Sequence, residues 1–106
     1  MDFDKAAALA AIRVAFSTEG SAVPTKHFTE MLASRQISND DVRHAALLGR
    51  IDRIDRTAAG AQTFRLVGPT LDGPAQEEIA VVFRLRNASS AILITCFAPP
   101  RRRRRT

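Results

Sequence analysis

The hydrophobic pattern of this chain changes once, near Gly49, from a helical repeat to an alternating one. Before Gly49, apolar residues recur at spacings of three and four, as they do on the buried face of a helix. After it, segments such as Glu78 to Arg86 alternate strictly, which is typical of strands with one buried face. This order predicts an α+β domain, with about three N-terminal helices packed on one face of an antiparallel sheet of three to four strands.

The residues ahead of Gly49 predict three helices. The first runs from Asp2 to about Thr18 and carries one apolar stripe, and the second begins at an N-cap, Thr25, after Pro24. The third has Ser38 as its N-cap, Asp41 completing a capping box, and Gly49 at the C′ position. The apolar residues expected to face the core are Leu9, Ile12, Phe16, Phe28, Met31, Leu32 and the staple pair Ile37 and Val42. The short hinge Gln36-Ile37-Ser38 predicts a sharp corner between the second and third helices.

The residues after Gly49 predict the sheet. Segments 62–67, 78–86 and 91–97 read as strands, and the last two are close enough to form a hairpin. Segment 50–56 fits a strand less well, because Ile51 and Ile54 are three residues apart rather than two. Residues 68–74 are expected to form a loop with a turn at Asp72-Gly73. The unbroken run Ile92-Leu93-Ile94 predicts a central strand that is buried on both faces.

The length of 106 residues predicts a single domain, residues 1–98, followed by a disordered Pro/Arg-rich basic tail, residues 99–106. The net charge is +5, yet Arg101 to Arg105 supply five positive charges, which leaves 16 − 5 = 11 basic against 11 acidic residues in the rest. The tail therefore carries the whole excess charge, and it serves either as a solvated terminus or as a weak, salt-dependent polyanion tether.

The cysteine count, the acidic residues and the hydropathy of the sequence exclude several kinds of site. A single cysteine, Cys96, excludes an internal disulfide and a cysteine-rich zinc site, and its apolar surroundings predict a buried thiol. Asp52 and Asp55 would face opposite ways in a regular strand, so no metal site and no cofactor is expected. The sequence shows no 18-residue apolar stretch and no signal-peptide pattern, which predicts a cytoplasmic protein without membrane contact.

A set of motifs spread over the last three quarters of the chain supports a comparison with a known family. The set comprises residues 27–38, Asp41-Val42, Gly49, Arg65 to Gly68 and Ile92 to Phe97. It resembles a family of small bacterial domains that is grouped with the RelE/ParE-like toxins and with BrnT. The resemblance implies a RelE-like fold and a toxin-type RNA endonuclease that is paired with an antitoxin protein. Many RelE-like ribonucleases use tyrosine near the scissile phosphate, whereas this chain has no tyrosine.

Metal-independent RNA cleavage needs a base, an acid and a cation that stabilises the phosphorane. His27 is the candidate acid or base, because imidazole titrates near neutral pH and the residue opens the second helix. Arg65 and Arg84 are the catalytic cation candidates. Lys26, Arg35 and Arg86 are the RNA-binding candidates.

Each assignment has a structural alternative. In these alternatives, His27 only packs or caps under the sheet, the strand arginines form a solvated face, and Arg35 forms a salt bridge with Asp40 or Asp41. A second interpretation of the whole chain is a catalytically silent domain of the same fold that binds a partner protein or forms a homodimer.

Overall fold

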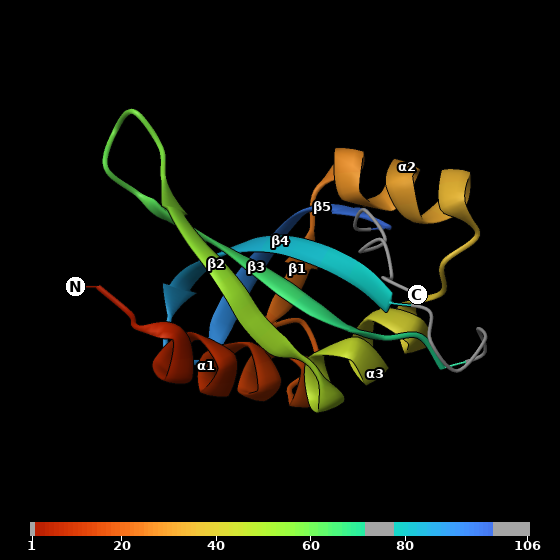
Figure 1. The fold of residues 1–106 in the computed structure, drawn as a ribbon, viewed down its shortest axis with the longest axis horizontal. Helices are drawn as coiled ribbons and strands as arrows, with labels where there is room; N and C mark the ends of the chain where they lie inside the picture. Colours follow the sequence, from red (N-terminus) through yellow and green to blue (C-terminus); the bar gives the residue numbers. More distant parts are fainter. Residues whose placement is uncertain (1, 72–77, 99–106) are drawn as a thin grey trace, which may run out of the picture.

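The computed structural model describes residues 2–71 and 78–98, and within them it contains three helices and five strands. The helices are α1 (Lys5–Ser17), α2 (Lys26–Arg35) and α3 (Asn39–Leu48). The strands are β1 (Ala22–Pro24), β2 (Arg50–Arg56), β3 (Gln62–Pro69), β4 (Glu78–Asn87) and β5 (Ser90–Phe97). This confirms the α+β class, with helices ahead of the long strands (Figure 1).

The described strands form one sheet in the order β1-β5-β4-β3-β2. Neighbours among β2, β3, β4 and β5 are antiparallel, whereas β1 runs parallel to β5. The sheet is therefore mixed and has one more strand than the upper end of the prediction. The additional strand, β1, was not predicted because it has only three residues and pairs with Ala91 to Leu93, about seventy positions further along the chain.

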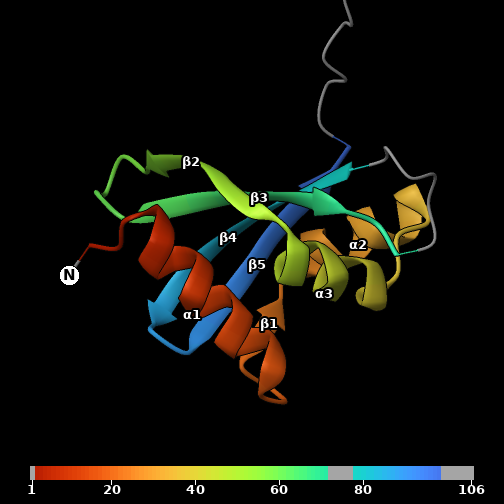
Figure 2. The ribbon, with the colours of Figure 1, turned by 60° about the horizontal axis from the view of Figure 1, so that its bottom comes forward.

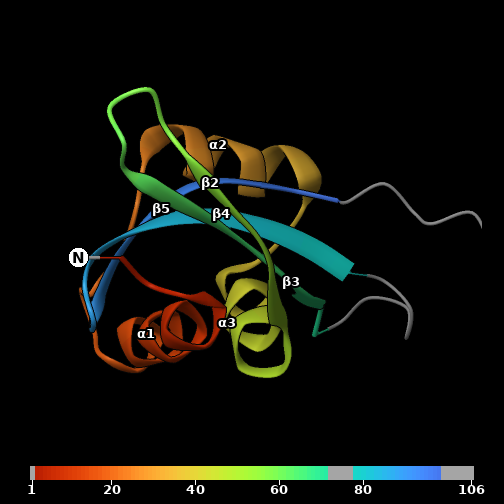
Figure 3. The same cartoon turned by 60° about the vertical axis from the view of Figure 1, so that its left-hand side comes forward.

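Helices α1 and α3 lie side by side on one face of the sheet (Figures 2 and 3). Helix α2 is placed differently from the prediction: it contacts β5 and β1 and lies along the edge of β5 beyond the end of β1. The sheet face opposite α1 and α3 is called the outer face below. Helix α2 borders this outer face at β5, where His27 contacts Thr95, and Figure 3 shows α2 on the other side of β5 from α1 and α3.

The core fills the space between the sheet and the helices. Phe28 of α2, Phe64 of β3 and Phe83 of β4 are essentially inaccessible to solvent. Phe64 and Phe83 stack with centroids 5.3 Å apart, and Phe3 meets the edge of Phe64 at 6.4 Å. Phe28, Phe64 and Phe83 are the largest fully buried side chains among the described residues, and they pack α2, β3 and β4 into one core.

Strand β2 contains a β-bulge that explains its irregular apolar spacing. Ile51 pairs with Leu66 and Ile54 pairs with Phe64, with a register shift between Ile51 and Arg53. The bulge absorbs one residue, so both isoleucines turn toward the core although they are three positions apart. The expectation that Asp52 and Asp55 face opposite ways was wrong for the same reason: Asp52 binds Arg65 and Asp55 pairs with Thr63, both on the outer face.

The capping box of α3 is confirmed. The Asp41 backbone N–H donates to Ser38 Oγ at 3.0 Å, and the Ser38 N–H donates to Asp41 Oδ2 at 3.0 Å. The other carboxylate oxygen of Asp41 accepts a hydrogen bond from the Leu71 N–H at 2.9 Å. One buried carboxylate thus ties the start of α3 to the segment that follows β3.

Gly49 ends α3, but its conformation differs from the prediction. It is extended, with φ −90°, rather than left-handed. A Cβ built at this position would lie 2.4 Å from the carbonyl oxygens of Ala45 and Val67. Close packing of α3 on β3, and not a left-handed turn, therefore requires glycine here. The left-handed residue of the corner is Gln36, which ends α2 with φ 56°.

Two further predictions need adjustment. β3 extends to Pro69, so the predicted loop starts later, and the Asp72-Gly73 turn lies outside the described residues, as does the tail 99–106. In β5, Leu93 is buried opposite Phe83 on the core face, whereas Ile92, opposite the exposed Arg84, and Ile94 are half-buried. The sequence run was correct for a strand but not for burial on both faces.

Candidate functional site

A row of side chains crosses the outer face of the sheet. Arg53 pairs with Arg65, Arg65 with Val82, and Val82 with Thr95, on four successive strands from β2 to β5. Directly paired residues in antiparallel strands point to the same face. The four side chains therefore form one row, called the outer row below, which ends at Thr95 on β5.

His27 lies at the β5 end of the outer row. Its Nε2 is 3.1 Å from Oγ1 of Thr95, a residue 68 positions further along the chain. The start of α2 is fastened to β5 by Thr25, whose N–H donates to the Leu93 carbonyl and whose hydroxyl donates to the Ile94 carbonyl. Phe28 is buried on the core side of α2. The preceding residue, His27, is consequently directed to the exposed side, next to Thr95.

Arg65 lies in the middle of the outer row but is held by a carboxylate. Its Nε and its terminal nitrogen each donate to one oxygen of Asp52, both at 2.9 Å, and both side chains are mostly buried. The hydrogen bonds from Arg65 hold the pKa of Asp52 below its ordinary value of 3.8, and the same pairing raises the pKa of Arg65. Both groups therefore stay charged, and most of the positive charge of Arg65 is cancelled by Asp52.

Arg84 is exposed and lies on the same face as the outer row. It is two residues along β4 from Val82, and its partner on β5 is Ile92. Val82 itself pairs with Thr95, and the register of β4 and β5 shifts between Val82 and Phe83. Arg84 also borders a cavity of about 270 Å³ beside Asp2 and the β2–β3 turn. Of the two predicted catalytic arginines, Arg84 has the more accessible guanidinium.

The predicted RNA-binding residues do not all gather around His27. Lys26 is exposed and precedes His27 at the start of α2. Arg35 ends α2, eight residues from His27 and therefore about 12 Å along the helix axis. Arg86 is exposed and lies at a register irregularity between Leu85 and Asn87, at the hairpin end of β4. The structure therefore brings Lys26 beside His27 but places Arg35 at the other end of its helix.

Arg35 instead lies near the thiol that the sequence placed in the core. Cys96 is fully buried, and this burial raises the pKa of its thiol, while the charge of Arg35 acts in the opposite direction. A buried thiol with a raised pKa is unreactive as a nucleophile. The described residues also contain no group of three or more His, Cys, Asp or Glu side chains that could hold a metal ion.

Sequence reasoning missed the role of Asp52 and the contact between His27 and Thr95. One sequence signal could have indicated the role of Asp52: Ile51 and Ile54 are three residues apart. A bulge explains this spacing, and the same bulge turns Asp52 toward Arg65. The contact between His27 and Thr95 depends on β1 placing α2 against β5, and no local pattern reports that pairing.

Comparison with known proteins gives no further assignment: no protein-family model, no curated protein and no solved structure matches this chain. In the parts of the chain that the structure describes, no helix is long and apolar enough to span a membrane.

Proposed function

We propose that this chain is a RelE-like toxin-family domain that cleaves RNA without a metal ion, with His27 as general acid or base. The observation that carries the proposal is the position of His27, whose ring contacts Thr95 on the same sheet face that bears Arg84. The proposal places the protein in the cytoplasm, where its substrate RNA is found, and includes a cognate antitoxin as its regulator.

The proposed reaction uses the 2′-hydroxyl of the RNA as nucleophile. A base removes the hydroxyl proton, the oxygen attacks phosphorus, and the bond from phosphorus to the 5′-oxygen breaks as that oxygen is protonated. The products are a 2′,3′-cyclic phosphate and a free 5′-hydroxyl. His27 performs one of the two proton transfers, since neutral imidazole accepts a proton and imidazolium donates one.

Arg84 is the cation of this proposal. A guanidinium offers several N–H donors to phosphate oxygens, and Arg84 is exposed on the face that His27 reaches. Lys26 adds positive charge beside His27. Arg65 has a smaller part than the sequence predicted, because Asp52 already occupies two of its donors. It supports the sheet under the substrate rather than stabilising the phosphorane.

The test is RNA cleavage in EDTA by the purified chain and by two histidine variants. His27→Ala is expected to lower the rate by about 100-fold or more, the usual contribution of a positioned acid or base. His44→Ala is the matched control, because His44 is the chain's other histidine and lies in α3, away from the outer face. Equal cleavage by wild type and His27→Ala, with both folded by circular dichroism, would remove His27 from the site.

The ion pair between Asp52 and Arg65 favours a second candidate, a catalytically silent domain of the same fold that binds a protein. This pair removes one of the two predicted catalytic cations. The distinguishing result is an absence of RNA cleavage and of growth arrest on expression, together with a stable complex with the product of an adjacent gene or with a second copy of the chain.

A further inference from the structure

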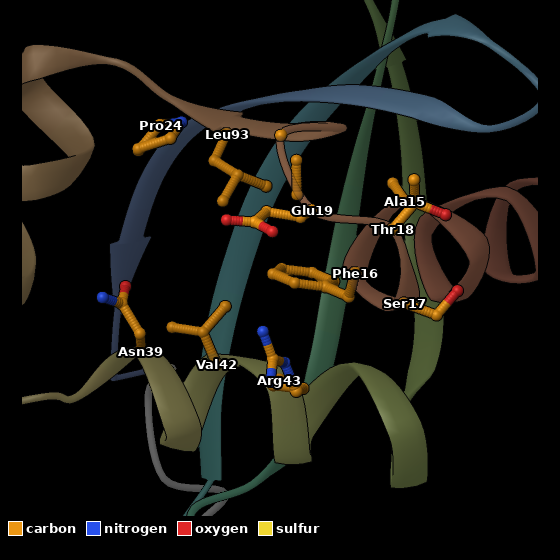
Figure 4. A pocket seen from close by; sticks show the side chains of 12 residues that line it. Ala15, Phe16, Ser17, Thr18, Glu19, Pro24, Asn39, Val42, Arg43 and Leu93 are labelled. Carbon is orange, nitrogen blue, oxygen red and sulfur yellow. The ribbon is translucent and has the colours of Figure 1, made fainter.

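A groove runs between α1 and α3 on the side of these helices that faces solvent. Its narrow part has a volume of about 160 Å³ and is lined by Arg13, Phe16, Ser17, Arg43, Ala46 and Leu47. It is continuous with a wider cavity of about 650 Å³ that shares Phe16, Ser17 and Arg43 and reaches the start of α3 and β1. The two parts together are called the α1–α3 groove. In Figure 4, Phe16 lies between residues of α3 and the segment that follows α1.

Apolar side chains are presented to solvent along this groove. Leu47 is 61% exposed, and Phe16 is only half-buried although it lies between two helices. Leu48 is 59% exposed but does not line the groove. Apolar surface that is continuous along a concave feature gains free energy when a partner covers it, unlike a single exposed leucine.

The walls of the groove are fixed before any partner binds. Arg13 of α1 donates from Nε to the Ala46 carbonyl at 3.0 Å and from a terminal nitrogen to the Gly49 carbonyl at 3.3 Å. These carbonyls belong to the C-terminal end of α3, where backbone oxygens lack partners within the helix. Arg13 therefore ties α1 to α3 and holds the groove open at a set width.

The walls of the groove favour a helical partner over an extended one. The walls of its narrow part come entirely from α1 and α3, so most of their backbone N–H and C=O groups are already used within the helices. They can offer mainly side chains to a partner. A partner that enters must satisfy its own backbone hydrogen bonds, which a helix does and an extended strand does not.

The charge of the groove favours a partner helix whose polar face is acidic. Arg13 and Arg43 line the narrow part, both in exposed positions, and the one acidic residue of the groove, Glu19, lies in the wider part. We propose that the α1–α3 groove binds an amphipathic helix of another protein, whose apolar stripe packs on Phe16 and Leu47 and whose carboxylates face Arg13 and Arg43.

This site is separate from the proposed nuclease site. The groove lies between α1 and α3, on the helical side of the sheet, whereas His27, Arg84 and the outer row lie on the outer face or at its border. Loss of binding at the groove and loss of RNA cleavage are therefore distinguishable in single variants.

The test uses a phage library of random helical peptides, selected on the full chain, and then fluorescence titration of the enriched peptides. The expected consensus has apolar residues at i, i+3 or i+4, and i+7, flanked by Asp or Glu. Leu47→Asp should weaken binding of these peptides by about tenfold or more, since burial of one leucine side chain corresponds to that range. Leu48→Asp is the matched control and should change binding less than twofold.

A charge reversal gives an independent readout. Arg43→Glu should weaken the acidic peptides and improve binding of versions in which Lys replaces the acidic residues, whereas Lys5→Glu, at the exposed start of α1, should leave both unchanged. Circular dichroism of each variant confirms that it is folded.

Two results would overturn the proposal. One is a library that yields no peptide, or only peptides that bind wild type and Leu47→Asp equally. The other is a concentration-dependent dimer in sedimentation equilibrium that Leu47→Asp abolishes and Leu48→Asp preserves, because the groove would then be occupied by a second copy of this chain.

Discussion

Substitution of Gly68 by alanine tests the contact on which the arrangement of α3 depends. Gly68 is buried in β3, and a Cβ built on it would lie 2.4 Å from the carbonyl oxygen of Ala45 and 2.9 Å from its Cα. Ordinary contacts of this type start at 3.4 Å, so α3 must move away from β3 by about 3.4 − 2.4 = 1.0 Å. The obstacle is helix backbone, which cannot rotate aside as a side chain can.

The cost follows from what such a movement disturbs. Val42, Ala45 and Ala46 are at most 1% exposed against the sheet, and a gap of this size forfeits a quarter to a half of each dispersion contact. Overpacking of this kind usually costs 1–3 kcal/mol, and we expect about 3 kcal/mol at Gly68 because two backbones collide. The variant should still fold, since domains of this size have about 5–15 kcal/mol of stability.

Urea denaturation followed by far-UV circular dichroism is the assay, because the chain contains no tryptophan or tyrosine for fluorescence. The sign of the change decides the outcome. Alanine is intrinsically better than glycine in a strand by roughly 0.5–1 kcal/mol, so without the clash Gly68→Ala would increase stability. An unchanged or increased free energy of unfolding would refute the close approach of α3 and β3. Gly60→Ala is the control, since no atom lies within 4 Å of its Cβ and only the backbone at φ +91° opposes alanine.

Two further predictions concern the corner and the outer row. Gln36→Gly should raise the free energy of unfolding by about 0.5–1 kcal/mol, because Gln36 has φ 56° and glycine adopts this conformation without strain. The control Ala33→Gly, within α2, should lower the free energy of unfolding by about 1 kcal/mol. A lower melting temperature for Gln36→Gly would contradict this prediction. Asp52→Asn should cost about 1 kcal/mol at pH 7. Since Arg65 lowers the pKa of Asp52 below 3.8, the ion pair contributes fully above about pH 5 and its contribution is lost as the pH falls through the folded-state pKa. The difference between wild type and Asp52→Asn should therefore shrink toward pH 3, and a constant difference would exclude the ion pair as its cause.

Features with a local signal in the sequence were predicted well. The capping box of Ser38 and Asp41 was found because both partners lie within one helical turn and each has a side chain suited to the other's N–H. The alternation in β4 was visible because its core face, including Ile79, Val81 and Phe83, is continuous along one strand. Such patterns arise from the geometry of a single element and do not depend on the rest of the fold.

Features that depend on distant pairing were not predictable in the same way. β1 becomes a strand only because β5 offers a free edge, and α2 is placed at that edge only because it follows β1 directly. The sequence does not show that Arg65 is unavailable to bind phosphate, because its partner, Asp52, is turned toward it by a bulge in the adjacent strand. For the candidate site, the sequence supplied residue types and the sheet register decided which of them share a face.

The register also limits what the outer face can do without a further element. His27 and Arg84 lie on or beside one face of the sheet. Between Thr95 and Arg65, however, the outer row contains the apolar side chain of Val82. An RNA bound there would meet charge at Arg84 and near Lys26 and an apolar surface in between, which suits a base lying flat on the sheet with its phosphate toward Arg84. If the face has this function, Val82→Lys should weaken base stacking while adding positive charge, so RNA affinity would become more salt-dependent as the cleavage rate falls. Higher affinity together with faster cleavage would show that phosphate attraction alone limits the reaction, and would argue against a base-binding role for the centre of the outer row.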